Sequence, residues 1–164
     1  TGLTFGPAVS PHLAAELAGE PIDTRALVSW VRAASADGRR VVVEGVGGLL
    51  VPLSSSFTVR DLAVALRLPV VVAARPGLGT INHALLTLAA ARQARLVVAA
   101  VVLTPWPARP STVEQSNRVT IERLGGVEVA TLPPLPRAEP DLLRQAGEQL
   151  PLHRWFATVE TPDR

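Results

Sequence analysis

The chain has 164 residues, of which 48% are hydrophobic and only 4% aromatic, so it is long enough for one domain with an aliphatic core. The formal net charge is only +2 and all 16 basic residues are arginine, which argues against a nucleic-acid-binding protein. Cysteine is absent, which excludes disulfides and thiol catalysis and fits a cytoplasmic protein. No apolar run is long enough to predict a membrane-spanning segment.

Two other residue types are also absent. The chain contains no methionine, not even at position 1, so we expect it to be a piece of a longer protein or a processed product. It contains no lysine, so any chemistry that needs an ammonium group must take it from outside these residues.

The first 40 residues predict two helices. Pro11 is in a favourable first position for a helix, which ends at Gly19. Pro21, Ile22 and Asp23 open a second helix, in which apolar residues recur at helical spacing until Asp37 and Gly38 end it.

Three consecutive valines, Val41 to Val43, are followed directly by Glu44 and by the glycine-rich segment 45–48. Such a run is typical of a strand that is buried on both faces of a parallel sheet. Ligands bind at the carboxyl ends of such strands, and glycines let the backbone approach a phosphate closely. Glu44 is therefore a candidate metal ligand, and the alternative is a carboxylate that only caps the next turn.

A polar loop at 54–57 separates this segment from the next helix. Thr58 followed by Asp61 predicts a capping box at the start of a helix that runs to about Arg67. A metal-binding or catalytic role for Asp61 is the alternative. The three serines at 54–56 predict an exposed loop, because no Gly-x-Ser-x-Gly motif surrounds them.

The segment 69–74 predicts a second strand, too uniformly hydrophobic to have a face in contact with water. A loop at 75–80 leads into a helix from Ile81 to about Gln93. The N-terminus of such a helix presents free amides that bind a phosphate or a carboxylate. Arg75 either faces this anion or is an ordinary exposed residue. The apolar side of the helix is expected to carry Leu85, Leu86, Leu88 and Ala89.

Two more strands are predicted at 96–103 and 127–131, with a helix between them that starts at Ser111. A final helix spans about 140–149, and residues 152–157 pack as a tail. Trp106, in the loop after the third strand, either stacks on a base or covers the loop. The alternation of strands and helices predicts an α/β fold in a single domain, residues 1–164, with a parallel sheet flanked by helices.

Two long blocks of the sequence resemble dethiobiotin synthetases. The first runs from Val43 to Leu53 (VEGVGGLLVPL) and the second from Arg75 to His83 (RPGLGTINH), and residues 10–12 match a shorter element. The resemblance covers about residues 4–140 and implies a P-loop NTPase-like fold. The first strand, the Walker-type loop and the second lysine-bearing strand of that family do not occur in this sequence. We therefore expect residues 1–164 alone not to catalyse phosphoryl transfer.

The resemblance implies a ligase of biotin biosynthesis that depends on ATP and Mg²⁺. In that family 7,8-diaminopelargonic acid takes up carbon dioxide as a carbamate, ATP phosphorylates the carbamate, and ring closure expels phosphate to give dethiobiotin. The resemblance also implies a homodimer. The composition, as argued above, predicts a cytoplasmic protein with no nucleic-acid or membrane partner.

The same resemblance implies roles for particular residues, although it assigns no catalytic residue within this chain. Glu44 would be the magnesium ligand, and Gly45, Val46 and Gly47 would line the nucleotide phosphates. The substrate carboxylate would be bound across the homodimer interface by Leu78, Gly79, Thr80, Ile81 and Asn82. The nucleotide base would be contacted by Thr104, Pro105, Leu132, Pro133 and Pro134.

Three questions stay open at this point. Thr104 and Pro105 replace the Asn-Asp pair of the commoner family pattern, so the nucleotide is ATP or another nucleoside triphosphate. His83 either makes a contact in the dimer interface or is a structural histidine. The alternatives to a dethiobiotin synthetase are a non-catalytic α/β binding or assembly module and another ATP-dependent amidoligase of the same superfamily, such as those of cobalamin synthesis.

Overall fold

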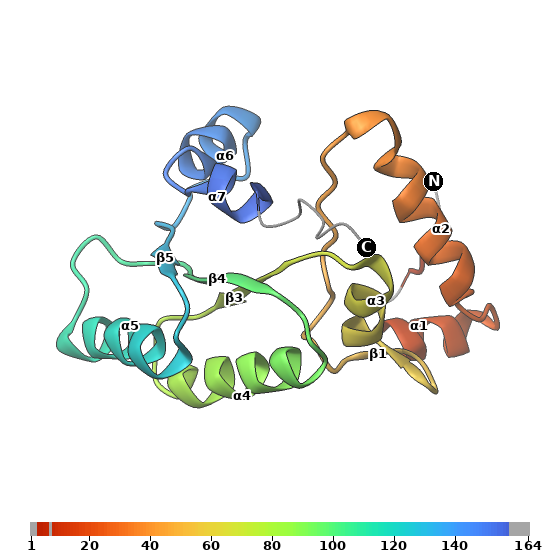
Figure 1. The fold of residues 1–164 in the computed structure, drawn as a ribbon, viewed down its shortest axis with the longest axis horizontal. Helices are drawn as coiled ribbons and strands as arrows, with labels where there is room; N and C mark the ends of the chain where they lie inside the picture. The colour runs from red at the N-terminus through yellow and green to blue at the C-terminus, as the bar shows by residue number, and fades with distance from the viewer. Residues whose placement is uncertain (1–2, 7, 158–164) are drawn as a thin grey trace. The chain divides into compact units, whose positions relative to one another are not determined.

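The computed structural model describes residues 3–6 and 8–157, apart from the side chains of Asp37 and Ala157. The chain forms two compact units, Thr1–Leu68 and Pro69–Arg164, and each is described by itself (Figure 1). The predicted α/β architecture is confirmed in the second unit, where helices flank a parallel sheet. The expectation that residues 1–164 form a single domain stays a prediction.

The first unit is built from short helices and one hairpin. Its elements are α1 (Pro11–Ala18), α2 (Thr24–Ala34), the 3₁₀ helix η1 (Ala36–Gly38), β1 (Pro52–Ser54), β2 (Phe57–Thr58) and α3 (Val59–Leu66). Gly19 ends α1 in the left-handed conformation, with φ +66°. The Asp23 carboxylate accepts hydrogen bonds from the N–H groups of Arg25 and Ala26 at the start of α2. Helix α1 begins at Pro11 and helix α2 follows Asp23, so both helices begin where the sequence indicates.

The prediction of a buried strand at Val41–Val43 was wrong. These residues belong to no strand, and Val42 is 84% exposed. A strand needs a hydrogen-bonded neighbour, and among the described residues none pairs with this segment. Three consecutive valines favour burial, but they do not determine whether a neighbouring strand is present to pair with them.

The second unit contains the sheet, with strands β3 (Val70–Ala74), β4 (Val98–Leu103) and β5 (Val129–Thr131) in the order β3-β4-β5. Both pairs are parallel, so β4 is hydrogen-bonded on both sides. The helices of the unit are α4 (Thr80–Gln93), α5 (Thr112–Gly125), α6 (Pro140–Gly147) and α7 (Leu152–Ala157).

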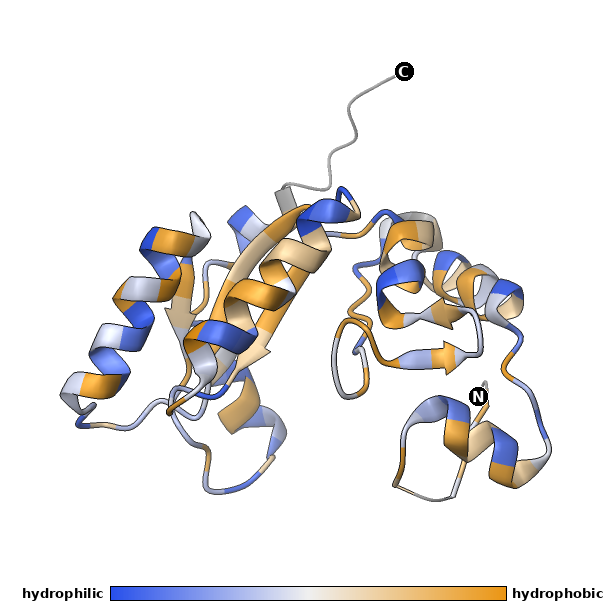
Figure 2. Cartoon of the chain, turned by 90° about the horizontal axis from the view of Figure 1, so that it is seen from below, coloured by the Kyte–Doolittle hydropathy of each residue, from blue (hydrophilic) through white to orange (hydrophobic). Residues whose placement is uncertain are grey.

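Helices cover both faces of this sheet (Figure 1). One core joins α4 and α5 to the sheet, and its fully buried members are Leu88, Val101, Leu103 and Ile121. On the other face, Trp155 of α7 packs against Ala100 and Val102. The strands are accordingly the most continuously hydrophobic part of the unit in Figure 2.

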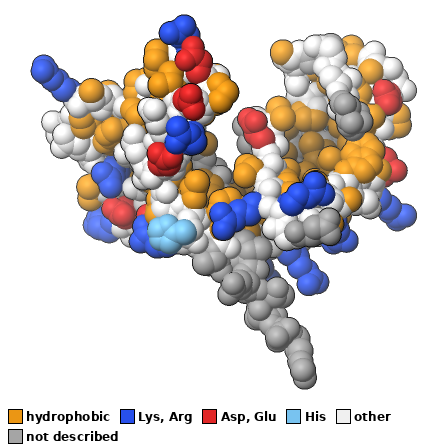
Figure 3. All heavy atoms as spheres, turned by 90° about the horizontal axis from the view of Figure 1, so that it is seen from above, with side chains coloured by type: hydrophobic (Ala, Val, Ile, Leu, Met, Phe, Trp, Pro, Cys, Tyr) orange, Lys and Arg blue, Asp and Glu red, His pale blue; other side chains and the backbone are white. Residues whose placement is uncertain are grey.

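Two predictions about burial in this unit were wrong. In β3, Val71 is 44% exposed, because the core around Trp155 contacts β4 and β5 and does not extend to this side of β3. In α4, Leu88 is buried as expected, but Leu86 is 60% exposed and Ala89 is also exposed. Hydrophobic side chains thus reach the surface, where Figure 3 shows them interspersed with arginines.

The contact between α4 and α5 depends on one glycine. A Cβ atom at Gly125 would lie 2.8 Å from Leu88 Cδ1 and 3.2 Å from Val127 Cγ1, so the absence of a side chain permits this close approach. The Arg92 guanidinium at the end of α4 donates to the carbonyls of Gly125 and Gly126. These contacts select which face of α5 packs on α4. Within the described residues no helix is long and apolar enough to cross a membrane.

We expect Trp155→Ala to destabilise the second unit by about 3 kcal/mol, because it empties a buried site on the face of the sheet that α7 covers. Trp155 is 6% exposed, whereas Trp30 in the first unit is 45% exposed. Trp30→Ala is therefore the matched control, with a clearly smaller loss. Chemical denaturation followed by circular dichroism measures both, and equal losses would contradict this account of the core.

Candidate functional site

Each of three predicted binding segments follows one strand of the sheet. Residues 78–82 come after β3, residues 104–105 after β4 and residues 132–134 after β5. The Thr104 N–H donates to Ala74 O at 2.9 Å, and the Leu132 N–H donates to Leu103 O at 3.1 Å. The Trp106 N–H then donates to Leu132 O at 2.7 Å, which ties the second and third loops together. The structure therefore gathers these segments at the carboxyl edge of one sheet, where ligands of open α/β sheets bind.

No side chain caps the N-terminus of α4. Gly79 precedes the helix in the left-handed conformation, with φ +87°, and provides no side-chain cap. The Thr80 N–H donates to Gly77 O at 3.3 Å and the His83 N–H to Gly79 O at 3.2 Å. Within the described residues, the N–H groups of Ile81 and Asn82 have no such partner. Two amides of the first turn are thus available to an anion.

The side chain of Thr80 adds a third free donor in the first turn of α4. Its side chain is 5% exposed, and its hydroxyl Oγ1 has no hydrogen-bond partner among the described residues. A buried hydroxyl without a partner costs about 1–3 kcal/mol. This hydroxyl belongs to the residue that immediately precedes the two free amides in the sequence.

The other two loops at this edge are rich in proline. The Thr104–Pro105 peptide bond is cis, and Pro105, Pro133 and Pro134 are exposed. Trp106 packs against the core shared by β4, α4 and α5, which agrees with the view that it covers the loop. Leu132 packs against the core on the opposite face. These loops therefore provide mostly apolar surface at the end of β4 and β5.

Glu44 and the following glycines lie in the first unit. Glu44 is exposed, and among the described residues it has no hydrogen-bond or ion-pair partner, so it caps no turn. A Cβ atom at Gly45 would lie 2.5 Å from Val59 Cγ1, and Gly47 adopts φ +84°. Gly45 and Gly47 are thus required by the packing and the backbone of this loop, independently of any ligand.

A single free carboxylate is compatible with Mg²⁺, which typically takes one or two carboxylates together with phosphate oxygens and waters. In the described part of the chain, no three histidine, aspartate or glutamate side chains gather as a metal site. Glu44 therefore fits a magnesium ion that a nucleotide helps to hold, and it does not fit an all-protein metal centre.

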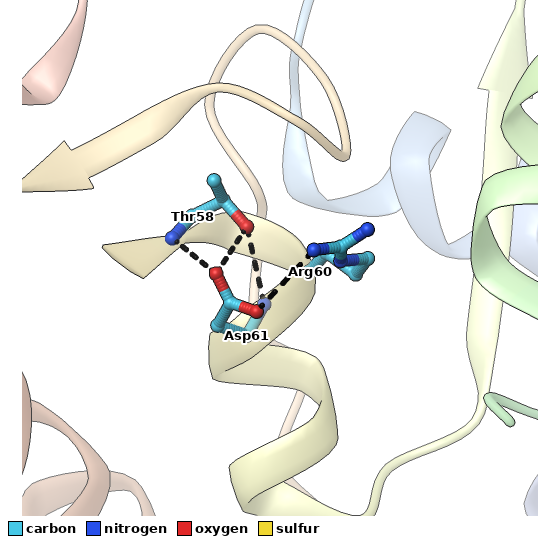
Figure 4. A network of polar contacts seen from close by, with 3 residues as sticks. All are labelled: Thr58, Arg60 and Asp61. Carbon is cyan, nitrogen blue, oxygen red and sulfur yellow. Dashed lines mark hydrogen bonds and ion pairs between the residues drawn. The ribbon is translucent and has the colours of Figure 1, made fainter. Parts of the chain in front are cut away.

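The capping box at α3 is confirmed (Figure 4). The Asp61 carboxylate accepts from the Thr58 N–H at 2.8 Å and from the Thr58 hydroxyl at 2.6 Å, and the Asp61 N–H donates to Thr58 Oγ1 at 3.3 Å. The N–H groups of Val59 and Arg60 donate to Val51 O and Leu49 O. All of these amides at the start of α3 are therefore occupied, in contrast to those of α4.

The hydrogen bonds from Thr58, helped by the Arg60 guanidinium, hold the pKa of Asp61 below its usual range. This explains Asp61 as a structural carboxylate. The predicted polar loop at 54–57 is only partly confirmed: Ser55 and Ser56 are exposed at the tip of the β1-β2 hairpin, but Ser54 belongs to β1 and Phe57 to β2.

Sequence reasoning did not single out Asn117. This residue of α5 is 7% exposed, and its side-chain amide donates to Pro76 O at 2.9 Å and to Gly77 O at 3.1 Å. Both carbonyls lie in the loop that precedes α4. The available signal was its position one turn before Ile121, on the face of α5 that is buried.

Comparison with known proteins places the chain among its relatives. A family model described as an AAA domain matches residues 1–141. The ATP-dependent dethiobiotin synthetase BioD of Mycobacterium sp. (strain KMS) is 44% identical over 131 residues, which are 79% of this chain and 57% of that protein. The protein of the same name from Haloferax mediterranei is 37% identical over 160 residues, covering 97% of this chain and 68% of the relative. That from Anaeromyxobacter dehalogenans is 43% identical over 143 residues, covering 87% and 63%.

The parallel sheet, the open helix N-terminus at its carboxyl edge and the family match together define an α/β domain of the P-loop NTPase-like, AAA-domain class. Within that class the chain belongs to the dethiobiotin synthetase family. The chain spans 57 to 68% of the length of the relatives named above.

We expect Asp61→Asn to lower the free energy of unfolding at neutral pH. Because the pKa of Asp61 is lowered in the folded state, its stabilisation is fully present above about pH 4, where the unfolded carboxyl is already ionised. It is lost as the pH falls through the folded-state pKa.

Urea unfolding between pH 7 and pH 2 measures this difference, which should shrink in acid as the native carboxyl becomes protonated. The exposed residue Asp141 provides the control, since Asp141→Asn should change stability by less than about 0.5 kcal/mol. A difference that persists unchanged to pH 2 would contradict the capping account.

Proposed function

We propose that the native protein containing this chain is a dethiobiotin synthase. It converts 7,8-diaminopelargonic acid, carbon dioxide and ATP into dethiobiotin, ADP and phosphate. The support comes from the family membership, the naming of the relatives and the two sequence blocks that match them. Bound ATP supplies the phosphoryl group that turns a carbamate oxygen into a leaving group for ring closure.

The observation that carries the proposal is the start of α4. The free N–H groups of Ile81 and Asn82 and the unpartnered Thr80 hydroxyl offer three donors to one anion. A helix N-terminus binds a carboxylate without a cationic side chain, which suits a chain that contains no lysine. We assign residues 78–82 to the carboxylate of 7,8-diaminopelargonic acid, so that this end of the substrate is held while the amines react elsewhere.

The remaining proposed roles concern the nucleotide and the metal. Glu44 would be a ligand of Mg²⁺, and the backbone of Gly45, Val46 and Gly47 would lie along the phosphates. The exposed prolines after β4 and β5, with Thr104 and Leu132, would offer an apolar surface to the base of ATP or another nucleoside triphosphate. Apolar contact of this kind selects less strongly between bases than paired amide hydrogen bonds do.

We further propose that the protein is a cytoplasmic homodimer, in which residues 78–82 of one protomer serve the substrate of the other. Exposed hydrophobic side chains near the start of α4 are consistent with this, since Leu78 is 98% and Leu86 60% exposed. His83, exposed in the first turn of α4, stands beside the same surface.

The activity is tested with the whole native polypeptide and with residues 1–164 in parallel. Each is incubated with 7,8-diaminopelargonic acid, bicarbonate, ATP and Mg²⁺, and dethiobiotin is measured by mass spectrometry. We expect ATP-dependent product from the native polypeptide and none from residues 1–164, because these residues contain no lysine and no Walker-type loop to hold the transferred phosphoryl group.

Absence of dethiobiotin from the native polypeptide would overturn the proposed function. ATP hydrolysis stimulated by a different carboxylate substrate would then favour another amidoligase, and the absence of any nucleotide turnover would favour a non-catalytic binding module.

Thr80→Val should weaken binding of 7,8-diaminopelargonic acid by about 10- to 100-fold, because it removes a hydrogen bond to a charged group. Calorimetric titration of the native polypeptide measures this. The matched control is Thr87→Val in the same helix, where the hydroxyl donates to His83 O at 2.8 Å.

A ligand control uses 2,3-diaminooctane, which keeps both amines and lacks the carboxylate. Its binding should be weak and insensitive to Thr80→Val. Equal losses for both ligands would show that Thr80 does not contact the carboxylate.

A further inference from the structure

We propose that Asn117 is a positioning residue of the anion-binding start of α4. It contacts the loop rather than the ligand, and it sets the orientation of the peptide groups that lead into the helix. The inference rests on the proposed function for its ligand, the substrate carboxylate, but its structural premise is independent of that function.

The first step in the argument is the burial of the Asn117 amide. The residue lies in the middle of α5 on the face toward the sheet unit's interior, and only 7% of it is exposed. Burying an amide is unfavourable unless its hydrogen bonds are formed. The amide nitrogen forms two, to Pro76 O and Gly77 O, so both of its N–H groups have acceptors in one loop.

The second step is the place of those two carbonyls. They belong to consecutive peptide groups between β3 and α4, 40 and 41 residues away from Asn117 in the sequence. Because α5 is held on α4 at Gly125 and Arg92, Asn117 acts from a fixed support. The loop is therefore anchored by tertiary structure rather than by its own residues.

The third step connects the loop to the free amides. Gly77 O accepts from Asn117 Nδ2 and also from the Thr80 N–H, the first N–H of α4. A carbonyl that faced the ligand would repel a carboxylate. By drawing Pro76 O and Gly77 O toward α5, Asn117 leaves the N–H groups of Ile81 and Asn82 as the polar groups presented at the helix start.

The test compares Asn117→Asp, which keeps the shape but cannot donate to two carbonyls, with Asn117→Ala. Both should weaken the binding of 7,8-diaminopelargonic acid by about tenfold or more, while ATP binding stays within about twofold of wild type. Gln115→Ala is the matched control, since Gln115 also lies in α5 and donates from its side-chain amide to a loop carbonyl, Pro110 O, at 3.1 Å.

A second readout uses residues 1–164 labelled with ¹⁵N and titrated with nonanoate, a plain carboxylate probe. In the wild type, nonanoate should shift the amide resonances of residues 79–82 and the side-chain amide of Asn117. In either Asn117 variant the amides of residues 79–82 should exchange faster with solvent, and in Gln115→Ala they should not. The wild-type measurement does not depend on any variant folding.

The outcomes separate the two proposals. If the native polypeptide does not bind 7,8-diaminopelargonic acid but nonanoate still shifts residues 79–82, the proposed substrate fails and the positioning role of Asn117 stands. A folded Asn117→Asp protein with unchanged carboxylate affinity and unchanged amide exchange would overturn the positioning role. A wild-type titration that leaves the Asn117 side-chain resonance unmoved would also overturn it.

Discussion

Parallel hydrogen bonding on both sides of β4 is the constraint on which the second unit depends. Ala100, Val101 and Leu103 in this strand have no exposed surface, so β4 forms the centre of both cores. Because β3 and β5 run in the same direction as β4, the loops after all three strands leave at one edge. The candidate binding segments are close together for this reason, although they are up to about fifty residues apart along the chain.

The helix starts in this protein differ in whether a side chain caps their free N–H groups. Asp23 closes the start of α2, and capping boxes close the starts of α3 and α5. At α4 the capping position is held by a glycine in the left-handed conformation, and the nearest hydroxyl, that of Thr80, is buried without a partner. The first-turn amides, which capping side chains satisfy in α2, α3 and α5, thus have no side-chain cap in α4. The starts of α1 and α6 also lack a side-chain cap, but a proline there removes one of the free N–H groups, whereas the first turn of α4 contains no proline.

The sequence predicted local features well and packing less well. Helix starts at Asp23, Thr58 and Ser111 depend on side chains two or three residues away, and all three are confirmed. The strand at Val41–Val43 was wrong because strand formation depends on a neighbour that local sequence does not specify. The buried side of α4 was only partly right, because Leu86 and Ala89 face outward where four apolar residues had been expected to share one side.

By itself the sequence determined the alternation of strands and helices from Pro69 onward, the starts of most helices and the resemblance to dethiobiotin synthetases, since these depend on short-range chemistry and on residues in a fixed order. Only the tertiary structure decided that Gly45 makes room for Val59, that Gly125 lets α5 approach Leu88, and that Asn117 reaches the loop before α4. Each of these joins positions distant in the sequence. Their geometry comes from the packing of whole elements, which no local pattern encodes.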